Sequence, residues 1–193
     1  GMAYLIKKTS LTLTQKMYVE KITQSSKTML GIINDILDFS KIEAGKVDLE
    51  TVPFNLDQVI QNVVNIVSYK IEEQESGFVL TKDPSIPNWF FGDAKRLEQI
   101  LINLLNNAAK FTSAGEVALD IRLLARESDR YHLSFTVKDT GIGMTDEQVG
   151  KLFAPFTQGD VSINRRFGGT GLGLSIVKNL VDMMGGEIQV YST

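Results

Sequence analysis

The chain has 193 residues, of which 43% are hydrophobic and 22% are charged, as in a globular protein with one full domain and an accessory segment. The formal net charge of -3 provides no general basic field, so we expect no nucleic-acid partner. The absence of cysteine excludes disulfides and cysteine-ligated metal sites and is compatible with a reducing cytoplasm. No apolar run approaches the roughly 18 residues of a membrane span, so any membrane anchor is expected in parts of a parent protein outside this sequence.

Residues 15–44 are predicted to form one long helix. Apolar side chains recur along it at three- and four-residue steps: Tyr18, Ile22, Met29, Ile32, Ile33, Ile36, Leu37 and Phe39. A stripe on so long a helix needs a partner, and the short apolar segment 2–6 can supply only part of one. We interpret residues 1–45 as part of a helical hairpin whose stripe is buried by a second copy of the chain. The alternative is a helix packed on its own domain.

From residue 46 to residue 193, strand and helix patterns are mixed. Strands are predicted at 47–49, 77–81, 117–123, 131–139 and 187–191. Helices are predicted after a capping box at Asn55 and Gln58, from Asp93 to about 111, at 145–152 and from about 171 to 184. The best strand pair is a hairpin, which indicates an α+β fold: a two-layer sandwich with a mixed, mostly antiparallel sheet and helices on one face.

The helix 96–112 carries the first candidate site. Its apolar residues share one face: Leu97, Leu101, Leu104 and Ala108. Beside that face Asn103, Asn107 and Lys110 form a polar stripe. Two amide oxygens one turn apart suit a hydrated Mg²⁺, and a lysine can reach phosphates. A solvated flank of an amphipathic helix explains this pattern equally well.

The segment Asp139-Thr-Gly-Ile-Gly143 is the second candidate site. Asp139 is in phase with the apolar face of the preceding strand, where a carboxylate is costly unless it has a partner such as an adenine amino group. Gly141 and Gly143 allow a backbone turn and the close approach of a ligand. An aspartate that merely begins a glycine turn is the common alternative.

A glycine-rich loop, Phe167-Gly-Gly-Thr-Gly-Leu-Gly-Leu-Ser175, runs straight into an apolar helix. Exposed amides at a helix start, aided by the helix dipole, bind phosphate. The loop is not a Walker loop, because no Gly-Lys-Ser/Thr follows. It does not fit a dinucleotide-binding loop either, because it does not follow a first βα strand with an acidic residue downstream.

Together and in this order, the three segments resemble the N box and the two G boxes of histidine kinases, in the superfamily shared with DNA gyrase. Leu152-Phe-Ala-Pro-Phe-Thr-Gln158 resembles the F box, and residues 25–50 resemble the second dimerisation helix of hybrid sensor kinases. The resemblance implies a Bergerat-type ATP-binding fold and the cofactors ATP and Mg²⁺. It also implies a homodimer through the N-terminal helix, and a response-regulator receiver domain whose aspartate takes the phosphate from histidine.

The resemblance also implies roles for individual residues. Asn107 matches the family's Mg²⁺ ligand, and Asn103 lines the same metal site. Asp139 matches the aspartate that reads adenine. The remaining positions implied to bind ATP are Lys110, Phe111, Gly141, Gly143, Phe156, Arg165, Arg166, Gly169, Thr170, Gly171, Leu172 and Gly173. A lid would run from about 144 to 168, with Phe153 and Phe156 as anchors.

The sequence departs from the family pattern in two places. The phosphoacceptor histidine is expected about a dozen residues before Gly1, and the one histidine present, His132, is interpreted as an exposed strand residue. Family members usually continue into one more strand beyond Thr193. We therefore expect that these residues alone cannot autophosphorylate. Rival interpretations are a hydrolytic ATPase clamp, disfavoured because Asn103 stands where a glutamate base is needed, and a nucleotide-sensing scaffold without transfer activity.

Overall fold

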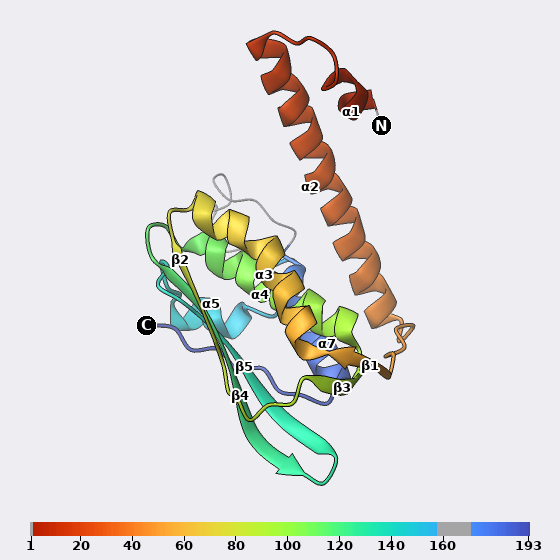
Figure 1. Cartoon of the computed structure of the whole chain (residues 1–193), viewed down its shortest axis with the longest axis vertical. Helices are drawn as coiled ribbons and strands as arrows, with labels where there is room; N and C mark the ends of the chain where they lie inside the picture. The colour runs from red at the N-terminus through yellow and green to blue at the C-terminus, as the bar shows by residue number, and fades with distance from the viewer. Residues whose placement is uncertain (1, 158–170) are drawn as a thin grey trace. The chain divides into compact units, whose positions relative to one another are not determined.

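The computed structural model describes residues 2–157 and 171–193 (Figure 1). The chain divides into two compact units, Gly1–Lys46 and Val47–Thr193. Each unit has its own pattern of secondary structure. The first is helical, and the second combines helices with two small sheets.

The N-terminal unit consists of α1 (Met2–Ile6) and the long helix α2 (Leu13–Glu43). Thr12 begins α2 with a reciprocal capping box, in which its hydroxyl accepts from the Gln15 backbone N–H and the Gln15 side chain accepts from the Thr12 N–H. The helix ends at Glu43 with Ala44 as its C-cap, and Gly45 follows with a φ of 62°, a left-handed conformation that favours glycine. The predicted helix is confirmed to within two residues at each end.

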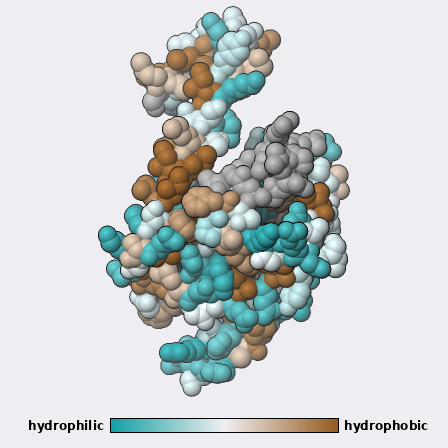
Figure 2. Space-filling model, turned by 180° about the vertical axis from the view of Figure 1, so that it is seen from behind, coloured by the Kyte–Doolittle hydropathy of each residue, from teal (hydrophilic) through white to brown (hydrophobic). Residues whose placement is uncertain are grey.

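The predicted stripe of α2 is largely exposed within a single chain. Brown hydrophobic side chains are visible on the N-terminal helical unit in Figure 2. The large apolar residues exposed on α2 include Tyr18, Ile22, Met29, Ile32, Ile33, Ile36 and Leu37. The buried residue of α2 is Val19. So many exposed apolar side chains on one long helix are characteristic of a surface that is covered in an assembly.

The second unit contains the mixed α and β elements. They are β1 (Val52–Asn55), α3 (Leu56–Glu73), β2 (Gly77–Lys82), β3 (Trp89–Gly92), α4 (Ala94–Phe111), β4 (Glu116–Glu127), β5 (Arg130–Asp139), α5 (Asp146–Lys151) and α7 (Gly173–Met183). One sheet has the order β2-β4-β5, with β2 parallel to β4 and β5 antiparallel to it. A second sheet pairs β1 antiparallel to β3. The α+β prediction is confirmed, with a long helix preceding a largely antiparallel two-layer unit.

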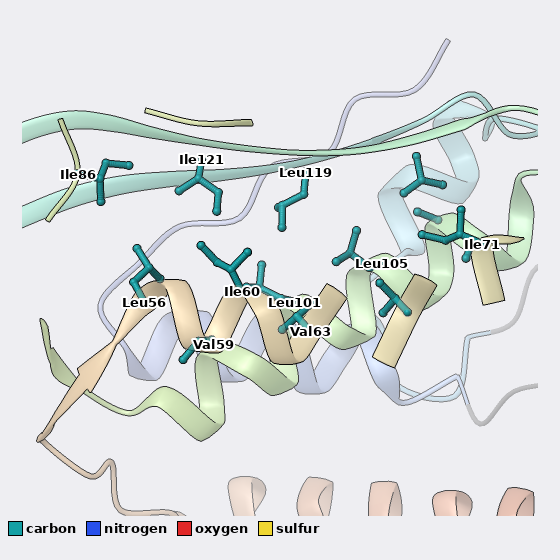
Figure 3. Close-up of a cluster of buried hydrophobic side chains, with 14 residues drawn as sticks. Leu56, Val59, Ile60, Val63, Ile71, Ile86, Leu101, Leu105, Leu119 and Ile121 are labelled. Carbon is teal, nitrogen blue, oxygen red and sulfur yellow. The ribbon is translucent and has the colours of Figure 1, made fainter. Parts of the chain in front are cut away.

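The core lies between the sheet and the helices α3 and α4. Alternate residues of β4 point to the helices and are fully buried, as Figure 3 shows for Leu119 and Ile121. Leu56 and Ile60 of α3 and Leu101 and Leu105 of α4 meet them. Burial of apolar surface of this kind provides most of the stability of such a unit.

The buried face of α4 differs by one residue from the prediction. The prediction placed Leu104 on this face, but the buried leucine is Leu105, and Leu104 is only partly buried. On a helix, Leu105 is about 40° from Leu101, whereas Leu104 is about 60° away on the other side. Since both residues are leucine, the sequence pattern alone could not decide between them.

Three further predictions about secondary structure are wrong. No strand forms at 47–49 or, among the described residues, at 187–191. The strand near the first position is β1, which pairs with β3, a strand that the pattern did not reveal. The capping box of α3 is only half formed, because Asn55 accepts from the Gln58 N–H at 3.1 Å while the Gln58 side chain donates to Asn62.

Asp93 holds the start of α4 through both of its carboxylate oxygens. The side chain is 6% exposed. One oxygen accepts from the backbone N–H of Arg96 at 3.0 Å, which is an N-cap bond, and the other accepts from the N–H of Glu50 at 3.2 Å. The carboxylate therefore ties the segment before β1 to the first turn of α4.

We expect Asp93→Ala to lower the free energy of unfolding by about 1–3 kcal/mol, because it removes an N-cap and leaves a second partly buried N–H unpaired. Asp93→Asn keeps one acceptor oxygen and is expected to lose less. Urea unfolding followed by circular dichroism measures both, with the exposed turn residue changed in Asp129→Ala as the control. Equal stabilities of Asp93→Ala and Asp129→Ala would contradict the role of this carboxylate.

Candidate functional site

The middle of α4 approaches the start of α7 at Asn103. The Asn103 side-chain nitrogen donates to the Gln99 carbonyl at 3.1 Å, which directs the amide oxygen elsewhere. A Cβ placed on Gly173 would lie 3.1 Å from that oxygen. Asn103 Oδ1 therefore faces the first turn of α7, and glycine at 173 keeps the approach open.

Asn107 and Lys110 follow Asn103 along α4, and all of them are half-buried. The Lys110 ammonium lies 4.8 Å from the centre of the Phe111 ring. Desolvation by burial lowers the pKa of Lys110 below its usual 10.5. A lysine in this setting interacts more strongly with an incoming anion than one in open solvent, because water screens it less.

The end of α4 meets the turn that follows β5. Asp139 is the last residue of β5, and its Oδ1 accepts from the Gly141 N–H at 2.9 Å, which closes the turn. A Cβ on Gly141 would lie 2.5 Å from the carbonyl oxygen of Phe111. Only glycine permits this contact, so Gly141 allows the turn after β5 to lie directly against the end of α4.

The environment of Asp139 corrects one premise of the sequence argument. The in-phase position predicted a carboxylate at the buried end of an apolar face, but Asp139 is exposed. Its partner in the ladder, Val117, is fully buried on β4. On β5, however, the apolar face ends at the partly buried Val137, one step of the alternation before Asp139. Since Oδ1 belongs to the turn, Oδ2 is the oxygen placed to accept from a ligand.

The same turn is held on its far side by the C-terminal residues. Gly143 has a φ of 66°, and a Cβ there would lie 2.9 Å from the carbonyl oxygen of Thr193. The next residue, Met144, donates its backbone N–H to the Ser192 hydroxyl at 2.8 Å. Sequence reasoning missed Ser192, because only the folded chain brings it to a turn 48 residues earlier.

The start of α7 lacks a capping side chain in the described part of the chain. Leu172 occupies the N-cap position and is buried, whereas α2, α3, α4 and α5 each begin with a side-chain cap, from Thr12, Asn55, Asp93 and Thr145. Gly171 precedes it with a φ of 70°. The first amides of α7 are therefore suited to an anionic ligand at the positive end of the helix dipole.

Phe156 reaches this region through its backbone rather than its ring. A Cβ on Gly171 would lie 2.9 Å from the Thr157 carbonyl oxygen and 3.0 Å from the carbonyl carbon of Phe156. The Phe156 side chain is 66% exposed and its φ is 59°. Phe153, the other expected lid anchor, is half-buried.

Several predicted positions fall outside the described residues, namely Arg165, Arg166, Gly169, Thr170 and the second part of the expected lid, residues 158–168. His132 is described, and it is an exposed residue of β5 opposite Ala125. This confirms its interpretation as an exposed strand residue.

The geometry defines a class of protein. Helix α4 brings together a carboxylate beside a glycine turn, polar side chains, and the uncapped start of a second helix. Among the described residues no cluster of three or more His, Asp or Glu side chains could hold a metal by itself. The elements that meet at α4 have the arrangement of a nucleotide-binding domain.

The chain belongs to the family described as histidine kinase-, DNA gyrase B-, and HSP90-like ATPases, whose model matches residues 92–193. The His Kinase A (phospho-acceptor) domain model matches residues 1–45. The chain thus combines part of a phospho-acceptor region with a histidine-kinase ATPase domain.

Similar proteins are sensor and hybrid histidine kinases. Hybrid signal transduction histidine kinase A of Dictyostelium discoideum is 43% identical over 199 residues, which cover all of this chain and 9% of that protein. Sensor histidine kinase GacS of Pseudomonas protegens is 43% identical over 193 residues, and BarA of Escherichia coli is 40% identical over 192. Each of these alignments covers all of this chain but only 21% of the relative.

Solved structures agree with the fold. Full-length ShkA in complex with AMPPNP superposes with a TM-score of 0.76 at 33% identity, covering 95% of this chain and 37% of that one. The histidine kinase AdeS of Acinetobacter baumannii gives 0.66 at 19% identity over 92% of this chain and 78% of that one, a likeness of fold alone. In residues 2–157 and 171–193, none of the helices combines the length and apolarity needed to cross a bilayer.

We expect Gly141→Ala to abolish nucleotide binding, because the new methyl group would overlap the Phe111 carbonyl and force the Asp139 turn away from α4. Gly150→Ala is the matched control, since a Cβ at Gly150 meets nothing within 4 Å. Isothermal calorimetry with ATP and Mg²⁺ measures the effect. Unchanged affinity in Gly141→Ala would show that this contact does not shape the site.

We expect Lys110→Met to weaken ATP binding about 10- to 100-fold, the loss of a charge-assisted contact to phosphate. The same change is expected to raise the Tm of the free protein, because burial disfavours the charged lysine. Since the pKa is lower in the folded than in the unfolded chain, this cost is complete below the lowered pKa. It declines as the pH rises through the lowered pKa toward 10.5.

Lys95→Met is the control for Lys110→Met, because Lys95 lies at the opposite end of α4 with its side chain 80% exposed. Calorimetry and thermal unfolding at neutral and alkaline pH provide the two readouts. A Lys110→Met protein that binds ATP as tightly as the Lys95→Met protein would remove Lys110 from the phosphate site.

Proposed function

We propose that this chain binds ATP with Mg²⁺ and transfers the γ-phosphate to a histidine on a dimerisation helix, from which an aspartate of a response-regulator receiver domain receives it. The observation that carries the proposal is the double contact of α4. Its end meets the Asp139 turn at Gly141, and its middle meets the start of α7 at Gly173. Base-reading and phosphate-binding elements thus share one helix.

The base end of the site is formed by Asp139, Gly141 and Gly143. Asp139 Oδ1 is held by the turn, and Oδ2 accepts from the exocyclic amino group of adenine. Phe111, whose carbonyl abuts Gly141, lines the same end of the site. Guanine carries a keto oxygen where adenine carries its amino group. That oxygen and the Asp139 carboxylate are both acceptors, so no hydrogen bond could form between them, and Asp139 therefore selects adenine.

The phosphate end is formed by Lys110 and the start of α7. The family resemblance adds Phe156, Arg165, Arg166, Gly169, Thr170, Gly171, Leu172 and Gly173 as further ATP-binding positions, of which Phe156 is a lid anchor. Leu172, whose side chain does not cap α7, and the left-handed Gly171 support a phosphate site at the start of this helix. Positive potential from the helix and Lys110 would stabilise the charge that accumulates on the transferred phosphoryl group.

Asn107 and Asn103 would hold Mg²⁺ together with the phosphates. The donor set fits, because Mg²⁺ prefers oxygen ligands and keeps several waters when the protein supplies few. The Asn103 amide is oriented with its oxygen toward α7 by the bond from its nitrogen to Gln99. Held there, Mg²⁺ would supply positive charge to offset that of the phosphates.

Transfer to histidine fits this site better than hydrolysis. Asn103 occupies the position on α4 from which a carboxylate base would activate water, and an amide does not accept a proton at neutral pH. The exposed stripe of α2 supports a homodimer that presents the acceptor histidine. His132 is exposed on a β strand, so self-transfer within residues 1–193 is not expected.

Asp139→Asn tests the nucleotide role, and the expected result is ATP affinity about 10- to 100-fold weaker. The asparagine keeps Oδ1 for the Gly141 N–H but presents an N–H₂ donor to the amino group of adenine. Asp146→Asn, which changes a nearby exposed carboxylate, is the control for calorimetry. Equal affinities in the two variants would remove adenine from the proposal.

Transfer is tested with radiolabelled ATP and a separately supplied helical hairpin that carries a histidine acceptor. We expect acid-labile label on the hairpin and none on the chain alone. Label on the chain alone that disappears in His132→Ala would overturn the assignment of His132. ATP binding without any label on an acceptor hairpin would favour a nucleotide-sensing scaffold.

A further inference from the structure

The C-terminal residues form one wall of the turn that is proposed to read the base. Met144 donates its backbone N–H to the Ser192 hydroxyl at 2.8 Å. A Cβ on Gly143 would lie 2.9 Å from the Thr193 carbonyl oxygen and 3.5 Å from the Ser192 hydroxyl. Two successive residues of the turn thus pack against two successive residues at the other end of the unit.

We propose that Ser192 is a positioning residue for nucleotide binding, which fixes the 139–144 turn so that Asp139 and Gly141 meet the base. The inference rests on the proposed function of this site. It assigns a role to a residue outside every motif that the sequence singled out, 53 positions after Asp139 by numbering.

Hydrogen bonds hold both ends of the turn. Thr140 donates its N–H to the Glu116 carbonyl at 3.1 Å, and Thr145 belongs to the capping box of α5, whereas residues 141–144 of the turn lie in neither a helix nor a strand. Its near side is fixed by the Asp139–Gly141 bond and by the contact of Gly141 with α4. The Ser192 hydroxyl supplies the matching constraint at Met144, where the partly buried N–H needs an acceptor.

The positive φ of Gly143 lies directly before the Met144 N–H that bonds to Ser192, so this bond helps to fix the course of the turn. At 66° the backbone reverses into a conformation that glycine alone adopts at low cost, and Thr193 leaves no room for a side chain there. Without an acceptor at Ser192, the Gly141–Gly143 segment loses its hydrogen-bonded constraint at Met144, so the turn that holds Asp139 Oδ1 is less firmly fixed beside α4. The loss would then appear in binding of the base rather than in overall stability.

The test compares the whole chain with Ser192→Ala and Ser192→Thr by calorimetry. We expect Ser192→Ala to bind ATP and ADP, each with Mg²⁺, about three- to tenfold more weakly and by the same factor, since the base is common to both. Ser192→Thr restores the hydroxyl and is expected to restore affinity. Hydrogen exchange at Met144 is expected to accelerate in Ser192→Ala alone.

Ser68→Ala is the matched control, because the Ser68 hydroxyl bonds to the Val64 carbonyl within α3. An equal Tm for Ser68→Ala and Ser192→Ala, with only the latter binding more weakly, supports positioning. Failure of the unmodified chain to bind nucleotide would instead refute the proposed function itself. Normal affinity in Ser192→Ala despite faster exchange at Met144, or lost affinity that Ser192→Thr does not rescue, would overturn the inference.

Discussion

The contact between Gly141 and the Phe111 carbonyl is the constraint on which the site depends. It sets the turn after β5 against the last residue of α4, at a distance that excludes any side chain. A second glycine, Gly173, allows a close but less restrictive approach of α7 to α4, since a Cβ there would lie 3.1 Å from the Asn103 side-chain oxygen. The buried leucines of α4 hold the helix against β4, so the core fixes one element and the glycines bring two others to it.

Because the core fixes α4 while the glycines position the elements beside it, the two faces of α4 have different chemistry. The face of α4 that includes Leu101 and Leu105 is filled to exclusion of solvent, whereas its neighbouring face keeps half-buried amides and an ammonium group. Partial desolvation of the Lys110 ammonium is unfavourable in the free protein. The apolar core offsets this cost, and a bound anion would interact favourably with Lys110 and with the positive end of α7.

The sequence predicted elements well where one segment determines its own structure. Helices α2 and α4 and the β4–β5 hairpin follow from local periodicity and capping residues such as Asp93. Prediction from the sequence failed where the structure depends on residues far apart in the chain. The strand β1 requires β3 as its partner, and the contact of Ser192 with Met144 exists only after folding. The motif residues Asn103, Asp139, Gly141 and Gly173 were predicted from the sequence, but the exposure of Asp139 was not, since alternation indicates a face and not its depth.

The closed turn at Asp139 has a consequence for kinetics. Its Oδ1 is already engaged by the Gly141 N–H, and the carboxylate is open to solvent before any ligand arrives. In the proposed function, a base would therefore encounter a preformed acceptor, without waiting for this turn to order. Under these conditions nucleotides with different bases are expected to associate at similar rates and to be distinguished by how long they remain bound.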